Sequence, residues 1–231
     1  MMWNVFRRAL LSGLPLATAL AIPAPQLQAQ AVVVDTPLQR QLHRLDLGIS
    51  GIGLFNGSTS GVNYANTNPR PAQAQVLTQS TSNTLGALVT LRYTYRPLIG
   101  AEINYGYARY NQTYSAVLSG VQTNVNEYTV GYVAHGPELL GFGIKPFGAV
   151  GAGATAFTPT TFGGQGLREQ ARATYYYAVG VEAPVAFEGH VGIRAQVRQA
   201  FFIAPDFGQN YLTIKQRTST FEPAIGIVFR Y

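Results

Sequence analysis

The chain has 231 residues, a formal net charge of +6 and no cysteine. Its basic residues are scattered, so this mild positive charge does not indicate a nucleic-acid partner. Without cysteine the protein can form no disulfide and carry no lipoprotein anchor. An exported form must therefore hold its fold by hydrogen bonding and burial alone.

The N-terminal residues predict a cleaved signal peptide. Arg7 and Arg8 form a positive region, and Ala9–Ile22 then runs without a charge. This run is shorter than the roughly 20 residues that a spanning helix needs. Small residues at Ala29 and Ala31 are typical of a cleavage site, which we place after either of them. The expected organisation is a signal peptide over 1–31, a short periplasmic N-terminal extension over 32–42 and one domain over 43–231.

The rest of the chain predicts β-strands. About 200 residues remain, and removing Arg7 and Arg8 leaves 14 basic against 10 acidic residues, a net charge of +4. No apolar run of spanning-helix length follows, and a membrane protein without one must be a closed β-barrel. Eight segments of roughly a dozen residues alternate apolar with small or polar side chains, as barrel strands do. They are 43–55, 84–95, 100–110, 124–134, 145–157, 174–183, 190–202 and 221–231. The faces of segment 145–157 are hard to tell apart because it is rich in glycine and alanine.

The connections between these segments alternate in length. The compact ones are 96–99, 135–144 and 184–189; the long polar ones are 56–81, 111–123, 158–173 and 203–218. Outer-membrane barrels place short turns in the periplasm and long loops outside the cell. The fold class that we predict is therefore all-β, a closed antiparallel up-and-down transmembrane β-barrel of eight strands. Segment 56–81 is rich in Asn, Ser, Thr, Gln and Gly, which predicts a mobile, solvated loop.

One parity of the last segment is apolar or aromatic, which predicts a lipid-facing girdle and an assembly signal. Its members are Phe221, Ile225, Ile227, Phe229 and Tyr231. A soluble β-sandwich, or a soluble barrel with an apolar interior, would show the same alternation. Strand length about twice that usual in soluble sheets, and aromatic residues near strand ends, favour lipid on the apolar side.

The opposite parity of the strands carries charges of both signs, which predicts a charged lumen. The acidic members are Asp46, Glu102, Glu127, Glu182 and Glu222; the basic members are Arg92, Lys145, Arg194, Arg198 and Arg230. An eight-stranded barrel is just wide enough to be filled by side chains, and an unpaired charge inside it would be costly. We therefore expect ion pairs between neighbouring strands, Arg92 with Glu102 and Glu182 with Arg194.

With these features the chain resembles the small outer-membrane β-barrels of the OmpA transmembrane-domain and OmpX type. The segment running from Arg194–Arg198 to Ala204–Gly208 also resembles a group of uncharacterised outer-membrane barrel proteins. The resemblance implies a monomer in the outer membrane of a Gram-negative bacterium, with membrane lipids and the outer-membrane assembly machinery as partners. It implies membrane stabilisation and surface contact. No peptidoglycan-binding domain follows Tyr231, so cell-wall tethering is not expected.

The sequence predicts no catalytic, cofactor or metal site, and hence no enzyme. The three histidines, His43, His135 and His190, all map to the predicted periplasmic rim. None lies in a His-x-Ser-Asn arrangement like that of outer-membrane lipid A deacylases. Isolated turn histidines are far commoner than a three-histidine metal site.

Three functions stay open from the sequence. The leading one is a structural or surface-interaction barrel, the second a narrow pore for ions or small solutes, and the third a lipid-modifying enzyme. No ligand of the long loops is identified.

Overall fold

The computed structural model describes residues 36–63, 75–115, 120–139, 141, 143–186 and 189–230. The predicted signal peptide and Tyr231 lie outside these residues. Among the helices of the described residues, none has the length and hydropathy needed to cross a membrane.

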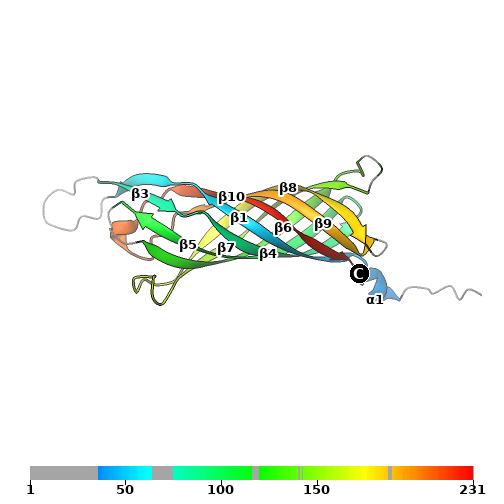
Figure 1. The fold of residues 1–231 in the computed structure, drawn as a ribbon, viewed down its shortest axis with the longest axis horizontal. Helices are drawn as coiled ribbons and strands as arrows, with labels where there is room; N and C mark the ends of the chain where they lie inside the picture. Colours follow the sequence, from blue (N-terminus) through cyan, green and yellow to red (C-terminus); the bar gives the residue numbers. More distant parts are fainter. Residues whose placement is uncertain are drawn as a thin grey trace, which may run out of the picture. The chain divides into compact units, whose positions relative to one another are not determined.

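Eight long antiparallel strands close into a barrel (Figure 1). They are β1 (Leu45–Asn56), β4 (Thr84–Arg96), β5 (Ile99–Tyr114), β6 (Val121–His135), β7 (Lys145–Pro159), β8 (Gln170–Ala186), β9 (Val191–Ile203) and β10 (Arg217–Arg230). Each of these strands pairs with the next one in the chain, and β10 pairs with β1 to complete the ring. The predicted closed eight-stranded barrel is confirmed.

Two further strands lie in the segment predicted to be a solvated loop, so that prediction was wrong for residues 59–63 and 75–81, whereas 64–74 lie outside the described residues. β2 (Thr59–Asn63) pairs with β3 (Gln75–Thr81), and β3 continues the sheet beside the far end of β5, with Gln79 opposite Tyr114. The segment is mostly polar, which led to the loop prediction, but one apolar residue in it is buried. Leu77 is only 2% exposed, and its burial holds the hairpin against the barrel.

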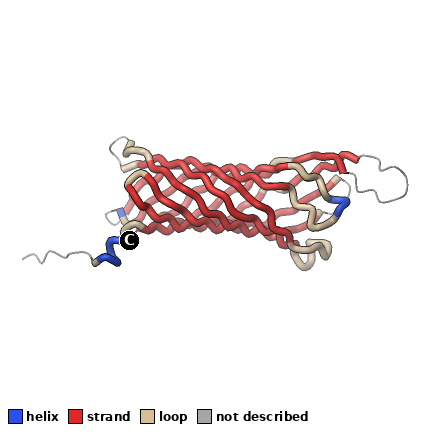
Figure 2. Tube along the Cα trace, turned by 180° about the vertical axis from the view of Figure 1, so that it is seen from behind, coloured by secondary structure: helices blue, strands red, loops and turns tan. Residues whose placement is uncertain are grey.

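The two ends of the barrel differ. At one end the connections are short, and β4 is joined to β5 by residues 97–98 alone. The helix α1 (Pro37–Leu42) lies at this end, near the end of β10 (Figure 1). Thr36 caps α1 in a capping box with Gln39. The other end carries the β2–β3 hairpin and the 3₁₀ helix η2 (Asn210–Leu212). The long strands run between these two ends (Figure 2). We call them the short-turn end and the long-loop end.

The outer wall of the barrel is apolar. β5 alternates strictly between exposed and buried residues along its length. Three mid-strand residues predicted to face outward, Val130, Val179 and Ile193, are 61%, 60% and 43% exposed. In β7, whose faces the sequence left undecided, Phe147 and Phe157 are buried while Val150 is exposed, so the odd-numbered residues face the lumen.

Candidate functional site

The lumen holds most of the chain's buried charge, and its first cluster lies toward the short-turn end. It contains three acidic and three basic residues: Asp46, Glu102, Glu182, Arg92, Arg194 and Arg230. We call this set the short-turn cluster. Its opposite charges balance in number, which is what a confined, low-dielectric space requires.

Arg92 joins the two halves of the short-turn cluster. Its side chain is 0% exposed, and it donates to Glu102 (Nη2 to Oε2, 2.8 Å) and to Glu182 (Nη1 to Oε1, 2.5 Å). The first contact is between neighbouring strands. The second runs from β4 to β8, which are four strands apart in a ring of eight and therefore on opposite walls. The contact between Arg92 and Glu182 therefore joins two opposite walls across the lumen.

Glu182 is the acceptor shared by three guanidinium groups. Besides Arg92, it accepts from Arg194 Nε at 2.8 Å and from Arg230 Nη2 at 2.7 Å. Arg194 also donates to Asp46 at 3.0 Å and is 1% exposed. Both neighbour pairs expected from the sequence, Arg92–Glu102 and Glu182–Arg194, are therefore in contact.

A second set of charges lies nearer the middle of the barrel and centres on Arg198. This side chain is 3% exposed and donates to Glu127 and, at 2.6 Å, to Glu222. The pair with Glu222 joins neighbouring strands, whereas Glu127 belongs to β6, three strands away. We call these three residues the middle cluster. It also spans the lumen.

Tyr176 connects the two clusters. Its hydroxyl donates to Glu102 Oε1 at 2.8 Å and accepts from Asn104 Nδ2 at 2.9 Å. The guanidinium of Arg198 lies over its ring, 4.2 Å from the centroid. Tyr176 shares its parity on β8 with Glu182, which places it on the inward face, but the sequence predicts no role for it.

Two glycines make room for Tyr176. Gly131, Gly151 and Tyr176 form one cross-strand row over β6, β7 and β8. A Cβ at Gly151 would lie 2.4 Å from the Tyr176 ring, and one at Gly131 would lie 2.2 Å from its hydroxyl. Glycines adjacent in register to an aromatic residue are the signal that could have identified this contact.

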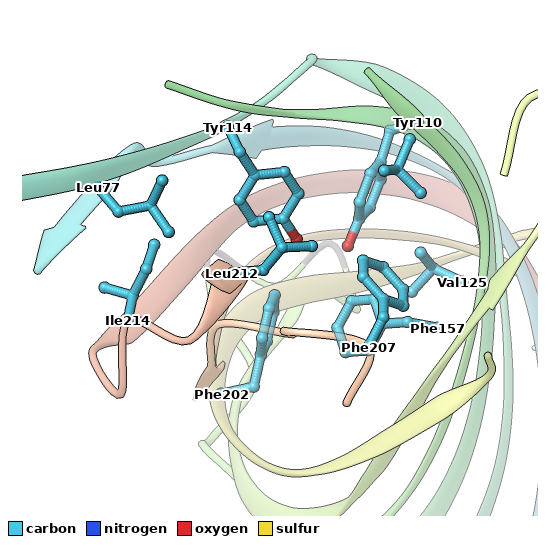
Figure 3. Packing of buried hydrophobic residues seen from close by; sticks show 10 residues of the cluster. Leu77, Tyr110, Tyr114, Val125, Phe157, Phe202, Phe207, Leu212 and Ile214 are labelled. Carbon is cyan, nitrogen blue, oxygen red and sulfur yellow. The ribbon is translucent and has the colours of Figure 1, made fainter. Parts of the chain in front are cut away.

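An apolar cap closes the lumen at the long-loop end (Figure 3). Residues 204–216 leave β9, turn inward and return to β10. They bring Phe207, Leu212 and Ile214 against side chains of the barrel wall. The cap consists of Leu77, Tyr110, Tyr114, Val121, Val125, Phe157, Phe202, Phe207, Leu212 and Ile214. Between this cap and Arg198 remains a cavity of about 20 Å³, which holds about one water molecule.

Polar contacts hold the capping loop in place. Gln170 Oε1 accepts from the backbone N–H groups of Asp206 and Phe207, both at 2.9 Å, and the hydroxyl of Tyr114 donates to the carbonyl of Pro205 at 2.9 Å. Phe207 adopts a φ of 52°, which is unusual for a bulky residue. Burial of its ring and the hydrogen bond from its N–H to Gln170 stabilise that conformation.

Asp206 is the charged anchor of the loop. Its carboxylate accepts from Gln170 Nε2 at 2.7 Å and pairs with Arg172 Nη2 at 3.0 Å. Burial raises the pKa of this carboxyl, but the hydrogen bonds from Gln170 and Gly208 N–H and the charge of Arg172 outweigh burial. The pKa therefore lies below its ordinary value of 3.8.

Replacing Asp206 with asparagine is expected to loosen the loop at neutral pH. The pKa of Asp206 is lower in the folded protein than in the unfolded chain. The carboxylate's contribution to the stability of the loop is therefore complete above its ordinary pKa and is lost as the pH falls through the pKa of the folded protein. In the wild type, protection of the Phe207 and Gly208 amides from hydrogen exchange should therefore hold at neutral pH. It should decline only below pH ~4. Asp206→Asn should show the weaker protection throughout, and the nearby Glu169→Gln should behave as wild type. Equal protection in Asp206→Asn and wild type would contradict this role.

The remaining predicted residues lie outside the clusters. Lys145 has the inward parity, but it begins β7 at the rim and is exposed. No ion pair joins it to another described residue, so its assignment to the lumen network was wrong. Phe221, Ile225, Ile227 and Phe229 lie on the outer wall and are 44%, 66%, 48% and 45% exposed.

The histidines are separated. His135 Nε2 lies 3.3 Å from Arg92 Nη1 at the edge of the short-turn cluster, and His190 Nδ1 lies 3.2 Å from the carbonyl of Arg230. Within the described ranges, no three His, Cys, Asp or Glu side chains are grouped so as to hold a metal ion.

Solved structures with the same architecture identify the fold. OprG, an outer membrane protein from Pseudomonas aeruginosa, superposes with a TM-score of 0.58 at 10% identity, covering 81% of this chain and 95% of that chain. The chain has the fold of the small eight-stranded outer-membrane barrels. Neisserial surface protein A superposes with a TM-score of 0.50 at 13% identity, covering 81% and 97%. No protein-family model matches the sequence, and no curated protein matches it significantly. At these identities the likeness establishes the fold.

Proposed function

We propose that the protein is a non-enzymatic barrel of the bacterial outer membrane, with a structural or surface-interaction role and a closed lumen. The signal peptide over 1–31 would direct its export, and the short-turn end would face the periplasm. The apolar outer wall supports contact with lipid. The exposed girdle from Phe221 to Phe229 supports recognition by the assembly machinery. Because lipid would cover the apolar outer wall, the barrel needs no second protein to cover it, which supports a monomer.

The observation that carries the closed lumen is the set of contacts between opposite walls. Arg92 reaches from β4 to Glu182 on β8, and Arg198 reaches from β9 to Glu127 on β6. Both side chains are nearly inaccessible, and the cap lies above them. An ion path needs continuous water, whereas the space beside the middle cluster holds about one molecule.

The pairing of the carboxylates supports a non-enzymatic role. A general base needs a carboxylate or imidazole that is free to take a proton from a substrate. Each of the five buried lumen carboxylates instead contacts at least one arginine.

Planar-bilayer recording of the purified protein tests the closed lumen. We expect insertion without unitary conductance steps. Heat-modifiable migration of the same preparation on a gel, and recovery of the cellular protein in the outer-membrane fraction, establish that the barrel is folded and inserted. Regular steps from inserted protein would favour the narrow pore, and recovery as a soluble periplasmic species would contradict the membrane barrel itself.

A further inference from the structure

A groove of about 710 Å³ runs over the outer wall across β5, β6 and β7. Its sides are outward, exposed residues such as Ile103, Val130 and Val150. Its floor lies at Gly131 and Gly151, the two positions left without side chains for Tyr176. Tyr176 and Glu102, which face the lumen, also line the groove, so the wall at these two glycines consists of backbone alone.

A polar, cationic site lies on the same strands toward the long-loop end. Arg109 on β5 faces outward, and its Nε donates to Asn124 Oδ1 on β6 at 2.7 Å. The hydroxyl of Tyr107 donates to the same oxygen at 3.4 Å, and that of Tyr105 donates to Asn126 at 3.0 Å. Asn124 holds Arg109 through Nε, and the terminal nitrogens of the guanidinium make no hydrogen bond to another described residue. They are therefore available for an anion. A planar guanidinium is well suited to bind phosphate through two parallel hydrogen bonds.

The distance between the groove and Arg109 matches the hydrocarbon thickness of one membrane leaflet. Arg109 lies six residue steps along β5 from Ile103, which borders the groove. At roughly 3.3 Å per residue this distance is about 20 Å. With the strands tilted by about 40°, this becomes roughly 15 Å along the membrane normal. The hydrocarbon core is about 30 Å thick. If the groove lies near the midplane, Arg109 lies at the level of the headgroups.

Small side chains leave a path between the two features. The outward residues of β7 in this stretch are Ala152, Ala154 and Ala156, which pair with Val130, Tyr128 and Asn126. The rings of Tyr105 and Tyr128 pack together beside this path, with centroids 5.2 Å apart. One acidic residue lies near the cationic end, since Thr158, the register partner of Asn124, donates to Glu169. Arg168 precedes it in the sequence, so the two residues together carry no net charge.

We propose that this face binds one phosphorylated lipid of the outer leaflet. A phosphate of its headgroup pairs with Arg109 beside Asn124, and an acyl chain runs past the alanines of β7 into the groove. The inference rests on the proposed membrane setting, because it assigns the long-loop end to the outer leaflet.

The test measures binding of bisphosphorylated lipid A, and of the same glycolipid without its phosphates, to purified protein in an uncharged detergent by native mass spectrometry. We expect one bound lipid, with Arg109→Gln weakening the phosphorylated form about 10-fold, equivalent to ~1.4 kcal/mol. The dephosphorylated form should bind Arg109→Gln and wild type equally. Ala152→Phe, which fills the path from an exposed position, should weaken both lipids.

Arg217 provides the matched control. It faces outward on β10 at the same end, above a smaller groove of about 450 Å³ at β1, β4 and β10. Its guanidinium makes no hydrogen bond to another described residue. Arg217→Gln should leave binding unchanged. Equal losses of lipid binding in Arg109→Gln and Arg217→Gln would show general charge attraction and would overturn the site. Full lipid binding by Arg109→Gln or by Ala152→Phe would also overturn it.

Two other outcomes are separable. Lipid-independent dimers that Ala152→Phe abolishes would assign the groove to a second copy of the chain and overturn the proposal. The assay needs only a folded barrel in detergent, confirmed by heat-modifiable migration of each variant. Failure of lipid binding is therefore distinguishable from failure of the chain to reach the outer membrane.

Discussion

Replacing Glu182 with glutamine is expected to lower the free energy of unfolding by about 3–5 kcal/mol, because it leaves buried cations without their shared anion. Arg92, Arg194 and Arg230 all donate to this carboxylate. Glutamine preserves its shape but removes its charge. Urea-induced unfolding of the protein in lipid vesicles would measure the change.

The same experiment on Arg194→Gln and on the double variant separates pairing from simple loss of volume. The two residues are in direct contact, so the double variant should lose less than the sum of the single losses, with a coupling energy of roughly 1–3 kcal/mol. Lys145→Gln is the matched control, since it removes an exposed charge at the same end and should change stability by at most about 0.5 kcal/mol. Small, additive effects of Glu182→Gln and Arg194→Gln would mean separately hydrated side chains and would favour an open pore.

Placing arginine at Val179 is expected to destabilise the inserted barrel by about 2–4 kcal/mol, the penalty for a cation on the lipid face near the bilayer midplane. Val179 is 60% exposed in the middle of β8, on the apolar outer wall. Unfolding from vesicles again provides the measurement.

Ile203 supplies the control for depth. It also faces outward and is 45% exposed, but it ends β9 at the long-loop end. Arginine there should cost about 0–1 kcal/mol, because the side chain reaches the interface. Equal costs at Val179 and Ile203 would show that the outer wall does not meet a bilayer with its midplane near Val179.

The sequence was sufficient for the barrel and for contacts between neighbouring strands. Strict alternation fixes which residues share a face, and chain order fixes which strands are adjacent, so the pair Arg92–Glu102 followed from parity and chain order together. Contacts across the lumen could not be predicted this way. Arg92 meets Glu182 only because the ring closes and sets these two positions at one height.

The cap and the extra hairpin were missed for a different reason. Phe207, Leu212 and Ile214 are scattered among polar residues with no strand or helix period. Their burial depends on the loop turning inward, which Gln170 on the distant strand β8 stabilises through its hydrogen bonds with Asp206 and Phe207. Lys145 shows the converse, since parity placed it inside but its position at the end of a strand leaves it in solvent.

The seam between β1 and β10 governs how such a chain can fold. These strands lie at opposite ends of the described barrel sequence, and every other pairing in the ring joins strands that are consecutive among the eight. Closing the longest loop carries the largest entropic cost and makes this pairing slow. Until it forms, both strands expose edges of unpaired N–H and C=O groups, which invite aggregation in water and cannot be satisfied in lipid. Ring closure and entry into the bilayer are therefore expected to be a single kinetic event. Arg194, which reaches across β10 from β9 to Asp46 on β1, fastens the seam once closed.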